Sequence, residues 1–148
     1  MPDTRPATLV PFRAPVQLKL SALWASLMFC YIYGDYFGLY VPGKLAAVGE
    51  GRMAFGELTP VSLALVAVMM AVPALMVALS VLLPAAWSRG LNLGLGVAYA
   101  AIMLLTMSGG APLFYLVLGA VEVLLSAAIV VYAWRWPRVG GAAESSRG

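Results

Sequence analysis

The sequence contains no histidine and a single cysteine, Cys30, and only 10% of its 148 residues are charged. The lack of histidine excludes histidine-ligated haem, histidine-containing zinc or copper sites and Ser-His-Asp triads. A single cysteine excludes an intrachain disulfide and a CxxC redox pair. The sequence therefore predicts no catalytic residue, no metal site and no cofactor.

Charged residues are scarce here because apolar residues replace them. A soluble domain carries roughly 25% charged residues, whereas 63% of this chain is hydrophobic. Four apolar segments are long enough for helices that cross a bilayer, which need about 20 residues with a range of roughly 17–25. They cover residues 18–40, 60–83, 91–107 and 112–134. The predicted fold class is all-α, an integral membrane antiparallel four-helix bundle whose main partner is the lipid bilayer.

Proline and glycine mark where these spans start and stop. Residues 1–17 hold four prolines and residues 137–148 are rich in Gly and Ser, so both are predicted to be disordered tails. Residues 41–58 form a polar connector, with a short interfacial turn expected at 44–48.

Three further signals shape the second and third spans. Thr59 and Pro60 have the residue types of an N-cap and a first helical position. Pro73 lies inside the second span and is expected to kink it. Residues 85–90 are read as a short link, so the second and third spans form an antiparallel hairpin.

The basic residues predict the orientation. Seven of the nine flank one set of span ends, and Lys44 and Arg52 flank the other. Those seven are Arg5, Arg13, Lys19, Arg89, Arg135, Arg138 and Arg147. The positive-inside rule places them in the cytoplasm, which predicts a multi-pass inner-membrane protein with both termini cytoplasmic. Because these residues border apolar spans, we interpret them as topology signals and expect no nucleic-acid partner.

Two carboxylates, Asp35 and Glu122, lie within the spans. A charge at membrane depth costs roughly 2.5–3.5 kcal/mol on insertion scales, so such residues usually face protein or water. Counting the helical rise places Tyr31 and Tyr99 level with Glu122, and Tyr115 near Asp35. No Lys or Arg is expected at either depth. We therefore predict that Glu122 faces the interior, is protonated near neutral pH, and bonds to Tyr31 or Tyr99.

These five residues form the candidate binding or proton-linked site, and plainer roles stay open for each part of it. A lone Glu122 can hold helices together by bonding to a neighbour. Asp35 can simply anchor the outer end of the first span. The methionines on the inward faces can be core filler, since Met fits irregular gaps.

Several short motifs in order resemble a known family. They are Leu23-Trp24, Tyr33-Gly34-Asp35 with Leu39 and Pro42-Gly43, Thr59-Pro60, and the run Tyr132-Ala133-Trp134-Arg135-Trp136-Pro137. Together they are similar to an uncharacterised bacterial four-span membrane family, domain of unknown function 6326, over roughly residues 18–137. The resemblance implies four spans and no reaction. A looser likeness to DoxX-like proteins concerns architecture alone.

Two functions fit this pattern. The first is binding or transport of a small molecule, cation or proton by the inward Tyr/Met/carboxylate surface, with transport needing a homodimer. The alternative is a non-catalytic membrane interaction or assembly subunit whose carboxylates are structural. An enzyme fits least well, because no nucleophile–base pair or metal constellation is present. Solvent access to Glu122 separates the first two hypotheses.

Overall fold

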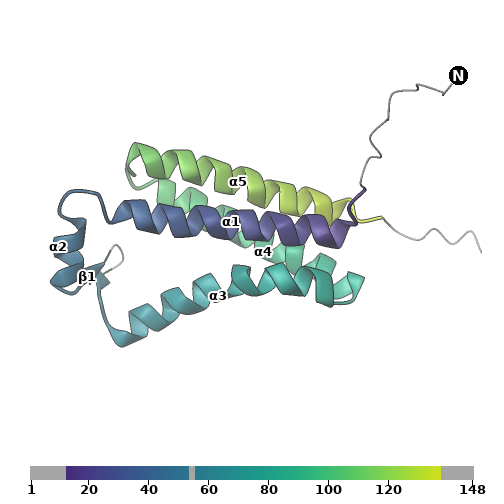
Figure 1. The fold of residues 1–148 in the computed structure, drawn as a ribbon, viewed down its shortest axis with the longest axis horizontal. Coiled ribbons are helices and arrows are strands. Elements are labelled where there is room, and N and C mark those ends of the chain that lie inside the picture. The colour runs from purple at the N-terminus through teal and green to yellow at the C-terminus, as the bar shows by residue number, and fades with distance from the viewer. Residues whose placement is uncertain (1–12, 54–55, 138–148) are drawn as a thin grey trace, which may run out of the picture.

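The computed structural model describes residues 13–53 and 56–137. Four long helices dominate it (Figure 1), each 22 or 23 residues long and apolar enough to cross a membrane. They are α1 (Val16–Gly38), α3 (Pro60–Leu82), α4 (Ala85–Met107) and α5 (Leu113–Trp134). The prediction of an all-α chain with four membrane-length helices is confirmed. Residues 1–12 and 138–148 of the two predicted tails lie outside the described residues.

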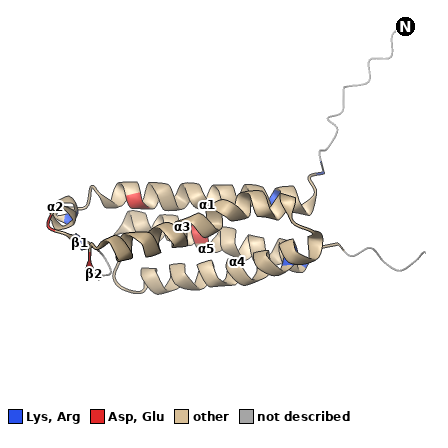
Figure 2. Ribbon diagram, turned by 90° about the horizontal axis from the view of Figure 1, so that it is seen from below, with Lys and Arg blue, Asp and Glu red and all other residues tan. Residues whose placement is uncertain are grey.

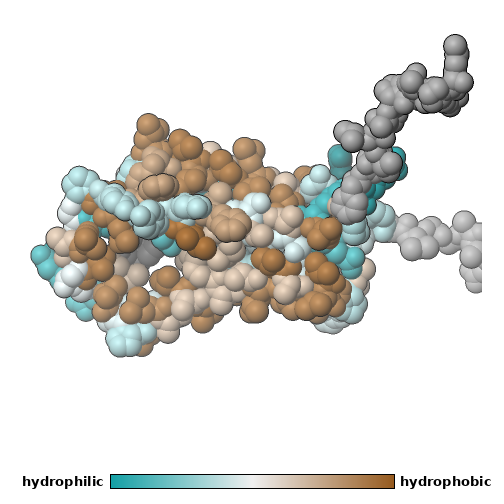
Figure 3. All heavy atoms as spheres, viewed as in Figure 1, coloured by the Kyte–Doolittle hydropathy of each residue, from teal (hydrophilic) through white to brown (hydrophobic). Residues whose placement is uncertain are grey.

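The four long helices lie side by side, each antiparallel to its neighbours (Figure 1). The helix α1 contacts both α3 and α5, and α5 also contacts α4. The start of α1 and the end of α5 therefore share one end, which we call the terminal end. Figure 3 shows hydrophobic side chains along much of the helices and the most hydrophilic ones at the two ends, with a paler hydrophilic band reaching inward from one end. This distribution is what a bilayer-embedded protein requires.

The connector at the opposite end holds more structure than the predicted turn. It contains the short helix α2 (Lys44–Gly49) and two two-residue strands, β1 (Arg52–Met53) and β2 (Gly56–Glu57). The strands pair antiparallel. Gly43 precedes α2 with φ 79°, a conformation that favours glycine. The first residue of α2 is Lys44.

The helix α3 begins where the sequence predicts. Thr59 is its N-cap and Pro60 its first residue, and Thr59 and Ser62 form a reciprocal capping box. The Ser62 amide donates to Thr59 Oγ1 at 3.1 Å, and the Thr59 amide donates to Ser62 Oγ at 2.8 Å. Pro73 lies inside α3, and the helix changes direction part-way along its length (Figure 1). This bend is the expected effect of an internal proline.

Two helix starts differ from the prediction. The third span begins at Ala85, so residues 85–90 are helical and do not form a link. The first begins at Val16, two residues before the predicted boundary. Pro84 and Pro15 occupy the N-cap positions of these helices. Pro84 was expected to close the second span and Pro15 to lie in the N-terminal tail, whereas each directly precedes the first residue of a helix, a place that suits proline.

Candidate functional site

The helix α5 turns Glu122 into the interior, as predicted. Its side chain is 3% exposed, and Gly119 and Ser126 on the same face are also buried. Their spacing of three and four residues gives a single inward stripe. In Figure 2 the long helices carry two acidic segments, one near the middle of the body and one toward the end of α1 that lies nearest α2. Glu122 is therefore placed to act inside the protein.

Glu122 lines a small cavity of about 110 Å³, the inner cavity, to which all four long helices contribute. Its lining consists of Tyr31, Gly34, Asp35, Met69, Met70, Ile102, Met103, Thr106, Tyr115 and Glu122. Four of the five candidate residues are therefore brought together, and Tyr99 is not among them. The titratable groups of this lining come from α1 and α5, while α3 and α4 supply methionine, isoleucine and threonine.

Glu122 was predicted to bond to Tyr31 or Tyr99, but in the described part of the chain no hydrogen bond joins it to either tyrosine. The Tyr99 hydroxyl donates instead to the Met69 carbonyl at 2.6 Å. Met69 lies four residues before Pro73, whose ring nitrogen cannot donate to it. The proline therefore leaves a main-chain acceptor free, and Tyr99 satisfies it. Its ring packs against Tyr31 and Trp24, with centroids 6.2 and 5.9 Å away.

The Oε2 atom of Glu122 is buried and has no hydrogen-bond partner among the described residues. Two of the three hydroxyl groups that line the inner cavity, those of Tyr115 and Thr106, already donate elsewhere, and that of Tyr31 makes no hydrogen bond to the described residues. Tyr115 donates to Thr106 Oγ1 at 3.0 Å, and Thr106 in turn donates to the Met103 carbonyl at 2.9 Å. A buried carboxyl oxygen without a partner is costly, so it is an unusual feature for a purely structural residue.

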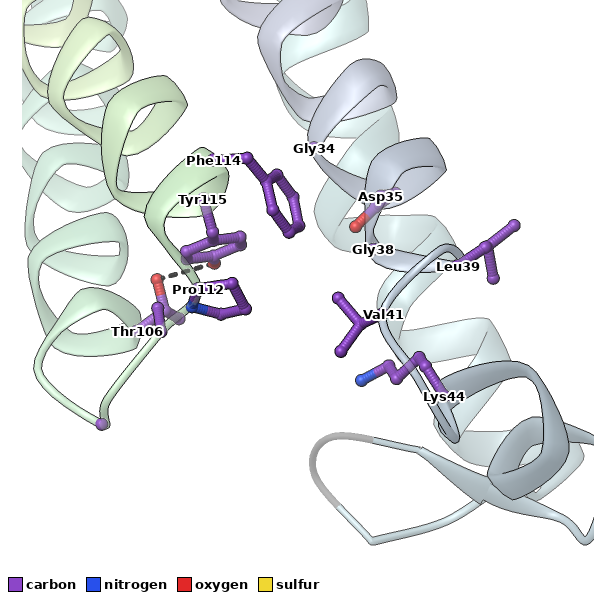
Figure 4. A pocket seen from close by; sticks show the side chains of 12 residues that line it. Gly34, Asp35, Gly38, Leu39, Val41, Lys44, Thr106, Pro112, Phe114 and Tyr115 are labelled. Atoms are coloured by element: carbon purple, nitrogen blue, oxygen red, sulfur yellow. Dashed lines mark hydrogen bonds between the residues drawn. The ribbon is translucent and has the colours of Figure 1, made fainter.

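A second, larger cavity of about 520 Å³, the outer cavity, adjoins the inner one. The two share Gly34, Asp35, Thr106 and Tyr115 in their linings. Figure 4 shows Asp35 and Lys44 on one side of the outer cavity, facing Thr106 and Tyr115. Asp35 is solvent-exposed and stands where the two cavities meet. The shared lining gives a route from the surface toward Glu122.

Lys44 corrects the expectation that no basic residue lies near Asp35. It belongs to α2, and the connector folds back so that Lys44 lines the outer cavity with Asp35. Depth counting along the spans could not reveal this, because Lys44 is not in a span. The mouth of the site thus carries charges of both signs, whereas the inner cavity carries carboxylates alone.

Toward the terminal end the interior is closed by a buried polar network. The Trp24 indole donates to Asn92 Oδ1 at 2.7 Å, and Asn92 Nδ2 donates to the Ser88 carbonyl at 2.8 Å. Ser88 Oγ donates to the Ser80 carbonyl at 3.0 Å. The side chains of all four residues are fully buried. Sequence reasoning missed Ser88 because it placed residues 85–90 in a link, whereas extending the helical periodicity back to Pro84 would have found it.

The helices and cavities define a small multi-pass membrane protein with an acceptor-lined interior. The chain belongs to the family of unknown function DUF6326, whose model matches residues 11–142. The predicted family resemblance is thereby confirmed. Comparisons with curated proteins and with solved structures gave no match, and the DoxX-like likeness is not shown.

Proposed function

We propose that this chain is a membrane protein that binds a small molecule, cation or proton in the joined inner and outer cavities. The observation that carries the proposal is the unpartnered, buried Oε2 of Glu122 at the wall of the inner cavity. Asp35, on α1, lies where the two cavities meet. Glu122, on α5, lines the inner cavity alone. A ligand would enter at the connector end and meet Glu122 last.

The alternative role, a carboxylate that only joins helices, fits the geometry less well. A residue that holds helices together does so through a hydrogen bond to a neighbouring helix. Glu122 makes no such bond to the described residues, whereas the Trp24–Asn92–Ser88 network makes several. The Trp24–Asn92–Ser88 network therefore joins the helices near the terminal end, and Glu122 is not needed for that role.

The basic-residue bias supports both termini being cytoplasmic, which would make the cavities accessible from the opposite side of an inner membrane. On that side the outer cavity is lined by Asp35 and Lys44. The core that lies between Glu122 and the terminal end is closed by Trp24 and its neighbours. Binding from one side is thus the basic activity we propose, and transport would need a rearrangement or a second copy.

Thiol accessibility tests this proposal directly. In a Cys30→Ser background, Glu122→Cys in proteoliposomes should react with a small charged thiol reagent added from the side of the connector. Ser126→Cys is the matched control, because Ser126 lies one turn deeper on the same face, is 1% exposed and lines neither cavity. Reaction at position 122 and protection at 126 are expected. Protection at both positions in folded protein would refute access to Glu122 and with it the proposed function.

A further inference from the structure

The inner cavity is rich in hydrogen-bond acceptors and poor in donors. None of its ten lining side chains carries an N–H group. The hydroxyls of Tyr115 and Thr106 already donate to Thr106 and to the Met103 carbonyl. What remains toward a ligand is the Glu122 carboxyl and the Tyr31 hydroxyl, which makes no hydrogen bond to the described residues, with Asp35 at the neck. Such a lining recognises a donor that carries positive charge and disfavours an anion.

The other lining residues favour an organic cation over a metal ion. Met69, Met70, Ile102 and Met103 make a large part of the wall apolar. Hard metal ions such as Mg²⁺ and Ca²⁺ require shells made of oxygen ligands, which this wall does not complete. An organic cation needs acceptors at its head only, and its hydrocarbon part packs well against flexible methionine side chains.

The size of the inner cavity sets an upper limit on the buried group. At about 110 Å³ it is somewhat smaller than the engineered cavity of about 150 Å³ that binds benzene. It therefore has room for a head group with a few methylenes. A longer stem would extend into the outer cavity past Gly34 and Asp35, which line both cavities.

We propose that the inner cavity binds a primary alkylammonium, with the –NH₃⁺ group at the Glu122 carboxylate and the alkyl stem along Met69, Met70 and Met103. Asp35 at the neck attracts the cation on its way in. In the outer cavity, Lys44 binds an anionic group at the far end of the ligand. An amine that also carries a distal carboxylate therefore fits the two cavities together. This inference rests on the proposed function and names the ligand class for that same site.

The test uses the full-length protein in lipid nanodiscs, with n-butylammonium as the probe. Binding is followed by calorimetric titration and by the shift of the thermal unfolding midpoint. Four comparison compounds each remove one feature: 1-butanol lacks the charge, butyrate reverses it, tetramethylammonium lacks the N–H donors, and sodium ion lacks the alkyl stem. Only butylammonium should raise the midpoint strongly at equal concentration.

Two matched variants locate the effect. Glu122→Gln keeps the shape and should weaken butylammonium binding roughly ten- to hundredfold, because a charge-assisted hydrogen bond is lost. Glu57→Gln makes the same chemical change at an exposed site in β2, outside both cavities, and should leave binding unchanged. If Glu122→Gln does not fold, Met70→Trp, which fills the cavity from α3, serves in its place.

The possible results distinguish a failure of the alkylammonium assignment from a failure of the proposed function. If 1-butanol or tetramethylammonium binds as well as butylammonium, or binding survives Glu122→Gln, the alkylammonium assignment is overturned. If Glu122→Cys reacts with thiol reagent yet no amine binds, the assignment fails and the accessible site stands. If position 122 is also inaccessible, both fail together.

Discussion

Tyr99 on α4 hydrogen-bonds to the main-chain carbonyl of Met69 on α3, with 2.6 Å between the oxygens. Pro73 leaves that carbonyl without its helical donor, so the bond stabilises the kink from a neighbouring helix. Ser88 on α4 makes a related bond, because its Oγ donates to the carbonyl of Ser80, which lies in the last turn of α3 and has no donor within that helix. Two α3 carbonyls that lack a donor within their own helix, one at the proline kink and one at the helix end, are thus satisfied by side chains of α4. Since Met69 lines the inner cavity, the first of these bonds also fixes the cavity wall.

This relationship predicts that Tyr99→Phe and Pro73→Ala are coupled. Tyr99→Phe alone should lower the free energy of unfolding by about 0.5–2 kcal/mol, because the Met69 carbonyl loses its donor. In a Pro73→Ala background the restored amide can bond to Met69, and the cost of Tyr99→Phe should shrink. A double-mutant cycle of unfolding in mild detergent measures this coupling. Equal cost in both backgrounds would contradict it.

Periodicity in the sequence predicts much of the candidate site. Asp35 and Glu122 stood out as carboxylates in apolar spans, and the helical rise placed Tyr31 and Tyr115 at their depths; the structure places all four on one cavity. Hydrogen-bond partners were harder to predict. Depth counting placed Tyr99 level with Glu122, but it could not show that a proline on a third helix offers Tyr99 a better acceptor.

The connectors between the helices also limited what could be predicted from the sequence. Lys44 reaches the outer cavity because Gly43 adopts a positive φ and α2 folds back, and neither follows from span periodicity. Ser88 was missed because Pro84 was read as a helix end and not as the residue that precedes the next helix. Both errors concern how the chain turns between helices, where a few backbone angles decide which side chains meet.

Ser88→Ala should destabilise the protein. The substitution removes the donor of the Ser80 carbonyl and an acceptor 3.3 Å from Asn92 Nδ2, leaving buried polar groups unpaired. A loss of about 1–3 kcal/mol in the free energy of unfolding is expected. Ser26→Ala is the control, since Ser26 is exposed and bonds only to the Ala22 carbonyl of its own helix. Similar unfolding curves for both variants would show that the network adds little.

Close contact between α4 and α5 depends on Gly96. A Cβ atom added there would lie 2.9 Å from Val130 Cγ2 and 3.3 Å from Ile129 Cγ2, and these branched side chains yield little. Gly96→Ala should therefore cost about 1–3 kcal/mol of stability through overpacking. Gly94→Ala, on the same helix with nothing within 4 Å of the added carbon, should be neutral or slightly stabilising. The thermal unfolding midpoints of the two variants measure the difference. An unchanged midpoint for Gly96→Ala would mean that α4 and α5 can move apart at little cost.

The orientation is tested by labelling from either side of the membrane. In a Cys30→Ser background, Glu50→Cys lies at the end of α2 and Ala86→Cys lies at the terminal end, both exposed. The basic-residue bias predicts that an impermeant reagent outside the cell reaches position 50 and not position 86. Position 50 reacting only from the cytoplasmic side would reverse the topology.

The last prediction concerns the proton on Glu122. Burial without a positive partner favours the neutral carboxyl, and the other titratable groups of the inner cavity are Tyr31, Asp35 and Tyr115. An alkylammonium binds the carboxylate, so binding should release the Glu122 proton to solvent. By linkage, amine binding should then strengthen as pH rises, as long as the amine itself stays protonated.

A pH indicator in weak buffer should record acid release when butylammonium is mixed with the wild-type protein. Glu122→Gln should abolish the release, while Glu57→Gln should preserve it, because Glu57 is exposed and lines neither cavity. The infrared band of a protonated carboxyl should be present without amine, be lost on amine addition, and be missing in Glu122→Gln. Amine binding without acid release would mean that Glu122 is already ionised, and the expectation of a neutral carboxyl would be wrong even though the binding site remained.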